Sequence, residues 1–264
     1  MEIYEPQGRA REYSPLALNY FKGCDHGCVY CYVPPMMTRF NKGYEHKNVF
    51  ATPDYKKIES SARKFQGCNK QILFSFTTDP YTKQNVDQTK RVLEILNFYG
   101  HKVAILSKGG NRILKDINIF KKFGDRIKVG VSITFDNYKD SKEWEHGAAL
   151  PQERIDVIEI LAKEGIKTWA SFEPVIIPEQ SLYMLKRILD VKVDHVKIGK
   201  LNNYKGIDKQ IDWQKFIGQA FDILRYDFYY DDKFYFKKDL MNFASDYQKS
   251  KFSFNELNED WLNL

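Results

Sequence analysis

Three cysteines within eight residues, Cys24, Cys28 and Cys31, are the side chains of this chain best suited to metal chemistry. Their spacing is Cys-x3-Cys-x2-Cys, and they follow a short apolar run. Thiolates hold iron–sulfur clusters, and a [4Fe–4S] cluster normally has four of them. Three cysteines would leave one iron without a protein ligand, and that iron could bind a small molecule and act on it. The motif therefore predicts an iron–sulfur site with one open position.

A zinc site is the alternative interpretation of this motif. Zinc prefers four tetrahedral ligands, often supplied as two Cys-x2-Cys pairs. The chain has four cysteines in total, and Cys68 stands alone, so no second pair exists. His26 is too close in the loop to complete a tetrahedron easily, which leaves His46 and Cys68 as separate candidates. We favour the cluster and keep zinc as the alternative.

Polar residues that could bind a charged ligand follow several of the predicted strands. Thr78 and Asp79 suit a cation, although Asp-Pro is also a turn former. Lys108 follows an apolar strand, so its ammonium group is expected at the strand end or in a solvated turn before two glycines. Glu173 lies in an apolar strand and is expected either to bind a ligand or to pair with a buried base such as Arg154.

The elements that position these residues alternate between strands and helices. We expect strands at 16–18, 72–76, 103–106, 129–133, 166–175 and 196–198, and helices over 92–99, 113–123, 151–164, 179–189 and 213–225. Such alternation implies right-handed βαβ units and a parallel sheet. Six units predict an α/β fold, a partial (β/α)6 barrel over residues 1–227, with ligands at the carboxyl ends of its strands. Residues 228–264, which mix aromatic and charged side chains, are predicted as a short C-terminal extension of the same domain.

The composition is that of an ordinary globular protein. Of 264 residues, 43% are hydrophobic and 29% charged, and the net charge of +6 permits a polyanionic substrate without requiring one. No apolar stretch approaches the ~20 residues that span a bilayer, and the N-terminus lacks the apolar core of a signal peptide. Three of the four cysteines share one loop, unlike a secreted disulfide framework. We expect a cytoplasmic protein without a membrane partner.

The stretch from Asn19 to Tyr32 resembles the cluster loop of the radical S-adenosylmethionine (SAM) superfamily, and more narrowly the spore photoproduct lyase-related, or DNA repair photolyase-like, group. The likeness covers about residues 16–200. It continues in Thr78-Asp-Pro-Tyr81, Leu106-Ser-Lys108, Ser132, Pro151-x-x-Arg154 and Glu173-Pro-Val-Ile-Ile-Pro178. It refines the expected fold to a partial barrel of the radical SAM type.

The resemblance implies two cofactors, a [4Fe–4S] cluster held by Cys24, Cys28 and Cys31, and SAM on the open iron. One electron, from a donor such as a flavodoxin or ferredoxin, would cleave SAM to a 5′-deoxyadenosyl radical that abstracts hydrogen from a substrate. The implied SAM contacts are Tyr30 at the adenine, Thr78 and Asp79 at the ammonium group, Lys108 at the carboxylate, Ser132 at the ribose or carboxylate, and Glu173 at SAM or substrate.

The same resemblance suggests a substrate, namely DNA or a nucleobase in a repair or modification reaction. The lyase that names the group uses a cysteine near the end of the second strand as its hydrogen donor, and residues 74–78 contain none. Tyr81 is near that place and is predicted to be catalytic, as a radical relay. Two alternatives remain open: a radical SAM enzyme that acts on a small molecule, protein or RNA, and a zinc-binding module without catalysis.

Overall fold

One sheet with its strands in chain order organises this protein. The computed structural model describes residues 2–48, 50–202, 204, 206, 209–227 and 234–251. The strands are β1 (Ile3–Tyr4), β2 (Leu16–Leu18), β3 (Gln71–Phe74), β4 (Lys102–Ser107), β5 (Ile127–Ser132), β6 (Lys167–Val175), β7 (His195–Lys200) and β8 (Phe234–Phe236). The pair β1–β2 is antiparallel and every later pair is parallel. Within the described residues β1 and β8 are the two edges, so the sheet is open and the predicted partial barrel is confirmed.

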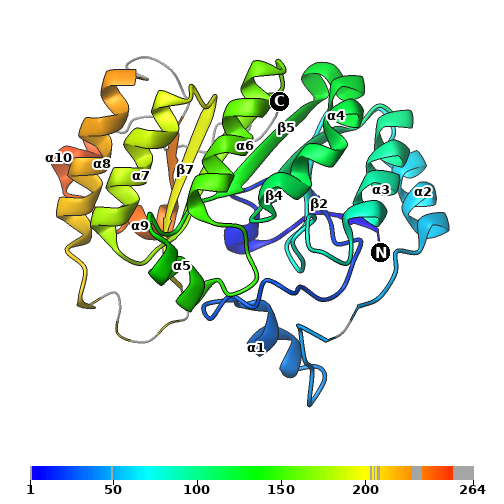
Figure 1. Ribbon diagram of the computed structural model, residues 1–264, viewed down its shortest axis with the longest axis horizontal. Coiled ribbons are helices and arrows are strands. Elements are labelled where there is room, and N and C mark those ends of the chain that lie inside the picture. The colour runs from blue at the N-terminus through cyan, green and yellow to red at the C-terminus, as the bar shows by residue number, and fades with distance from the viewer. Residues whose placement is uncertain are drawn as a thin grey trace.

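The helices alternate with these strands. They are α1 (Val33–Thr38), α2 (Tyr55–Lys64), α3 (Val86–Phe98), α4 (Ile117–Phe123), α5 (Tyr138–Trp144), α6 (Pro151–Lys163), α7 (Pro178–Asp190), α8 (Trp213–Asp227), α9 (Lys238–Met241) and α10 (Asp246–Lys251). Figure 1 shows α3, α4, α6 and α7 side by side on one face of the strands. Helix α1 projects at the bottom of the view, below the sheet. In the part of the chain that the structure describes, every helix is too short or too polar to span a bilayer.

The two faces of the sheet carry different side chains, as the two-residue period of a strand requires. Alternate residues such as Ile72 and Phe74 pack against the helices in the main core. The other face holds a small separate cluster that includes Leu73 and Trp169. The indole Nε1 of Trp169 donates to the Ile105 carbonyl at 2.7 Å. Trp169 therefore fills the inside of the curved sheet.

Most of the predicted elements match the structure, with differences at their ends. The predicted helix over 113–123 is divided into a 3-10 helix (Gly110–Asp116) and α4, and Asp116 lies at the junction with non-helical backbone angles. The strand predicted at 72–76 ends at Phe74. Gly124, which directly follows the predicted range 113–123, has a φ of 57°, which favours glycine at the helix end.

The C-terminal part of the chain adds to the same sheet. Strand β8 pairs with β7 in parallel, so residues 234–236 extend the run of parallel strands that begins at β2. Residues 228–233, which include Phe228-Tyr-Tyr, and residues 252–264 lie outside the described residues. The division of the chain at residue 227 remains a prediction.

Candidate active site

A cavity of about 390 Å³ lies at the carboxyl ends of the parallel strands. Its lining includes the motif cysteines and all of the predicted cofactor residues: Cys24, Cys28, Cys31, Tyr30, Thr78, Asp79, Lys108, Ser132 and Glu173. These residues are distant in sequence and meet because parallel strands end at the same edge of the sheet. The structure thus brings together every predicted site residue except Tyr81, whose position is described below.

The cysteine loop is anchored by its backbone. The amide of Cys24 donates to the His46 carbonyl at 3.0 Å. Gly27, between the first two cysteines, has a φ of 62°, and a Cβ atom there would lie 2.4 Å from Cε of Lys47. The end of the Lys47 side chain is flexible and could move aside, so it is the positive φ that favours glycine at position 27.

The cysteines of this loop are partly buried, and the nearby Lys108 does not offset the effect of burial on the pKa values of Cys28 and Cys31. Burial raises the pKa of Cys28 to about 12, and it also raises the pKa values of Cys24 and Cys31. Bound iron would supply the charge that stabilises all three as thiolates. Within the described residues, no group of three His, Cys, Asp or Glu side chains is arranged around a single ion. In a cluster each cysteine binds a different iron, so the donor set fits a cluster better than one zinc ion.

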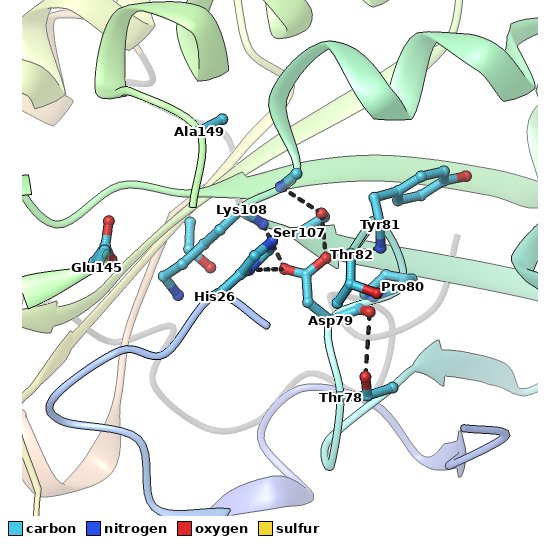
Figure 2. A network of polar contacts seen from close by, with 12 residues as sticks. His26, Thr78, Asp79, Pro80, Tyr81, Thr82, Ser107, Lys108, Glu145 and Ala149 are labelled. Atoms are coloured by element: carbon cyan, nitrogen blue, oxygen red, sulfur yellow. Dashed lines mark hydrogen bonds and ion pairs between the residues drawn. The ribbon is translucent and has the colours of Figure 1, made fainter. Parts of the chain in front are cut away.

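Asp79 ties the loops after β3 and β4 to each other (Figure 2). Its Oδ1 accepts hydrogen bonds from the Tyr81 amide at 2.8 Å and the Ser107 hydroxyl at 2.6 Å. Its Oδ2 accepts from the Lys108 amide at 2.6 Å. Thr78 donates its hydroxyl to the Gly23 carbonyl at 2.5 Å. The structure therefore gives both residues internal partners, and their contact with SAM stays a prediction.

His26 connects this network to the cluster loop. Its ring is almost fully buried, and burial lowers its pKa, so the neutral form is favoured. Nδ1 lies 3.4 Å from Oδ2 of Asp79, and the Arg112 guanidinium is 3.2 Å from Nε2. A neutral ring can donate from Nδ1 and accept at Nε2, which matches both neighbours. His26 is thus a structural link between the loop and the strand ends.

The side chains of Lys108 and Tyr30 lie near each other in the cavity lining. Nζ of Lys108 lies 5.7 Å from the centre of the Tyr30 ring. Lys108 also lines the cavity, and its contact with an anionic group of SAM stays a prediction. Ser132 lines the same cavity at the end of β5, and its carbonyl accepts from Arg154 at 2.8 Å.

Arg154 pairs with Glu145 and not with Glu173, which corrects one sequence-based alternative. Both Arg154 and Glu145 are 0% exposed, and Nη2 lies 2.5 Å from Oε2. Burial acts to raise the pKa of Glu145, but the charges of Arg154 and Lys108 outweigh it and hold that pKa below its usual range. Glu145 is not among the site residues predicted from the sequence. A single sequence carries no signal for this pairing, because the partners lie on different elements.

Glu173 reaches the cavity from β6 with two partners that sequence analysis did not assign to the site. Tyr13 donates its hydroxyl to Oε2, and Lys237 donates to Oε1 at 2.7 Å. Tyr13 and Lys237 also line the cavity. Lys237 follows β8 directly, so the C-terminal extension contributes a residue to the candidate site. A role of Glu173 toward SAM or substrate remains a prediction.

Tyr81 lies away from the cavity. This position does not favour its predicted role as a radical relay. The side chain is 0% exposed, packs in the main core and is not part of the cavity lining. Its hydroxyl donates to Oδ2 of Asp116 at 2.9 Å. Figure 2 shows the ring directed away from His26 and Lys108. The site lies at the strand ends, whereas Tyr81 turns back into the layer between sheet and helices.

Two uncharacterized proteins are similar to this chain in sequence. ORF301 of Acidianus two-tailed virus is 25% identical over 212 residues, which cover 74% of this chain and 69% of that protein. MJ0683 of Methanocaldococcus jannaschii is 27% identical over 161 residues, 60% of each chain.

Solved radical SAM structures are similar in fold. The SAM-bound crystal structure of SuiB from Streptococcus suis has a TM-score of 0.61 and 16% identity over 86% of this chain, and this chain covers 51% of SuiB. A spore photoproduct lyase mutant with bound SAM and dinucleoside spore photoproduct has a TM-score of 0.64 and 11% identity over 85% of this chain and 76% of the lyase.

The family assignment comes from the sequence as a whole. The sequence model of the radical SAM superfamily matches residues 18–191, which is more than half of the chain. That range contains the cysteine loop and every strand end that lines the cavity up to β6. Membership implies a [4Fe–4S] cluster and SAM as the cofactors, in agreement with the donor set of the loop. The chain belongs to the radical SAM superfamily.

Proposed function

We propose that this protein is a radical SAM enzyme that cleaves SAM reductively and abstracts hydrogen from DNA or a nucleobase, in a repair or modification reaction. The observation that carries the proposal is one cavity lined by Cys24, Cys28 and Cys31 together with Lys108 and Glu173. When bound, the cluster and SAM together supply a 5′-deoxyadenosyl radical after transfer of one electron. The electron would come from a small carrier such as a flavodoxin or ferredoxin.

The chain itself would hold, orient and enclose these cofactors. The three thiolates would hold the cluster. The ammonium group of Lys108 would bind the carboxylate of SAM through a charge-assisted hydrogen bond. The Tyr30 ring would pack near the adenine, and Ser132 would reach the ribose or carboxylate. The buried walls of the cavity would exclude water from a reactive intermediate.

Two observations support a nucleic acid substrate. The net charge of +6 suits a polyanion. The lyase of similar fold was solved with a dinucleoside lesion. Spore photoproduct itself is a poor candidate. The lyase that repairs it uses a cysteine as hydrogen donor, whereas Cys68 of this chain packs against the main core and does not line the cavity.

A peptide or protein substrate is the second candidate. SuiB, whose fold is similar with a TM-score of 0.62, was solved with its precursor peptide SuiA. The cavity lining combines an aromatic, a charged and a neutral polar side chain, namely Tyr32, Arg9 and Asn202, and such a lining suits a peptide as well as a nucleobase.

Reductive cleavage of SAM tests the proposal directly. The protein is reconstituted anaerobically with iron and sulfide, reduced in the presence of SAM, and assayed for 5′-deoxyadenosine. We expect product from the parent and from Cys68→Ala, and none from Cys28→Ala. Equal product from the parent and Cys28→Ala would refute the cluster assignment. A colourless preparation with one zinc per chain would favour the zinc module.

The substrate class is tested by binding. Association with DNA that weakens steeply as salt rises would support a nucleic acid substrate, because phosphate contacts release counterions. Intact SAM cleavage without such binding would favour a small molecule, protein or RNA substrate.

A further inference from the structure

The segment 144–147 forms a backbone ladder with the cluster loop. The Val29 amide donates to the Trp144 carbonyl at 2.8 Å, and the Gly147 amide donates to the His26 carbonyl at 2.7 Å. Between these two bonds, Cys28 and Glu145 form an antiparallel bridge. A cluster ligand is therefore paired directly with a residue more than a hundred positions later in the chain.

Gly147 allows this close approach. A Cβ atom at that position would lie 2.3 Å from the Asp25 carbonyl oxygen, a distance that real Cβ contacts do not reach. Because backbone atoms cannot be moved aside as a side chain can, any other residue would push the two segments apart. The fit indicates that the segment is built against the loop and is not merely adjacent to it.

The Glu145 side chain makes a second connection to the same loop. Its Oε1 accepts hydrogen bonds from the Tyr30 hydroxyl and, at 3.1 Å, from the Thr134 hydroxyl. Its Oε2 is 2.5 Å from the Arg154 guanidinium. One carboxylate thus joins the loop residue between the second and third cysteines to the chain that follows β5.

Arg154 fixes the carboxylate in turn. Besides Glu145, its guanidinium donates to the Ser132 carbonyl at 2.8 Å and, through Nε and Nη2, to the Ala149 carbonyl at 2.9 and 2.7 Å. Its guanidinium is thus bonded within the protein, and the side chain is fully buried. Arg154 is therefore held at the end of β5, where the predicted SAM contact Ser132 also lies.

A buried ion pair contributes little net stability to a fold. Apolar residues of similar volume often stabilise a fold as well or better, because the desolvation of two charges offsets their attraction. What an apolar pair cannot do is accept a hydrogen bond from Tyr30. The value of Glu145 therefore lies in where it holds the Tyr30 ring, which faces Lys108 at 5.7 Å and lines the cavity.

We propose that Glu145, held by Arg154, is a positioning residue that sets the Tyr30 ring in place for SAM. The inference rests on the radical SAM cofactors and not on the identity of the substrate. It predicts that Glu145 affects SAM binding through the Tyr30 hydroxyl, while the cysteines still hold the cluster.

A double-mutant cycle on the reconstituted protein tests this role. The variants are Tyr30→Phe, Glu145→Gln and both together, with Glu159→Gln as the control because Glu159 forms a surface pair with Lys163. The measurements are iron content, the electron paramagnetic resonance spectrum of the reduced cluster with and without SAM, and SAM affinity. We expect parental iron content in every variant and parental SAM affinity in the control.

We expect each single variant to bind SAM about tenfold more weakly, the scale of one lost hydrogen bond to a charged group. The double variant should bind SAM with about the affinity of whichever single variant binds it less tightly, because both changes break the same hydrogen bond. The SAM-induced change in the spectrum should shrink in all three. A merely structural role would lower thermal stability without this non-additive pattern in SAM affinity.

Parental SAM affinity in Tyr30→Phe, or losses that add in the double variant, would overturn the proposal. Tyr30→Phe removes only a hydroxyl, so it decides the matter even if Glu145→Gln does not fold. A parent that binds no cluster or SAM would refute the proposed function itself. A parent that binds SAM, with variants that bind it equally well, would refute the positioning role alone.

Discussion

Replacement of Asp79 by asparagine distinguishes a structural tie from a direct SAM ligand. The carboxylate accepts three hydrogen bonds at 2.6 to 2.8 Å from two strand-end loops, and its side chain is only 11% exposed. Asparagine keeps one oxygen, which can still accept from the Tyr81 amide and the Ser107 hydroxyl. Its NH2 group would instead face the Lys108 amide and the His26 ring, and it cannot accept from either.

The expected cost follows from these contacts. A hydrogen bond to a charged group contributes about 1.5–3 kcal/mol, and a buried donor without an acceptor is penalised on the same scale. Asp79→Asn loses the bond to Lys108 and weakens the other two, so we expect the free energy of unfolding to fall by about 3 kcal/mol.

Anaerobic urea unfolding measures this change. For a chain of this size, we expect the midpoint to fall by about 1 M with an unchanged slope, since the exposed surface area does not change. Asp156→Asn is the matched control, because Asp156 is exposed and accepts a surface hydrogen bond from Gln152. We expect the control to differ by less than about 0.5 kcal/mol. A parental midpoint in Asp79→Asn combined with weaker SAM binding would refute the structural role and favour a direct ligand.

Three further predictions concern single side chains. Lys108→Met should weaken SAM binding while the iron content stays parental; unchanged SAM affinity would remove Lys108 from the cofactor site. Tyr81→Phe should lower the free energy of unfolding by about 1–2 kcal/mol through its lost bond to Asp116, and leave 5′-deoxyadenosine formation intact; loss of that product would restore a catalytic role. Burial raises the pKa of Asp116 from 3.8 to about 6, so the folded state binds this proton more tightly and stability falls as pH rises from about 4 to about 6. Asp116→Asn has no carboxyl group to titrate. Its free energy of unfolding relative to the parent should therefore increase by up to about 3 kcal/mol between about pH 4 and pH 6. A difference between the two proteins that does not change with pH would contradict the raised pKa.

The fold was predictable from local patterns because its strands are short apolar runs and its helices have clear ends. Gly100 and Gly165 end the helices over 86–98 and 151–163 with positive φ, as their positions in the sequence indicate. The positions of the site residues were also predictable, since the carboxyl end of a parallel strand is a fixed place in the fold. The junction at Asp116 was not predicted from the sequence; in the structure the Asp116 side chain accepts a hydrogen bond from Tyr81, which lies on another loop.

The sequence by itself determined the cofactor chemistry. Cys24, Cys28 and Cys31 are close in the chain, so their spacing is enough to predict a loop that would hold a cluster with an open iron. The matching family covers residues 18–191 and agrees with that interpretation.

Only the tertiary structure decided which polar groups form hydrogen bonds or ion pairs with one another. Glu145 and Tyr30 are 115 residues apart, and Glu173 and Tyr13 are 160 apart. Periodicity shows which end of a strand a residue occupies, but a hydrogen-bond partner depends on how separate loops meet in space. Buried charges must find partners, and in this protein those partners, Arg154 for Glu145 and Lys237 for Glu173, come from elements that only the folded sheet brings together.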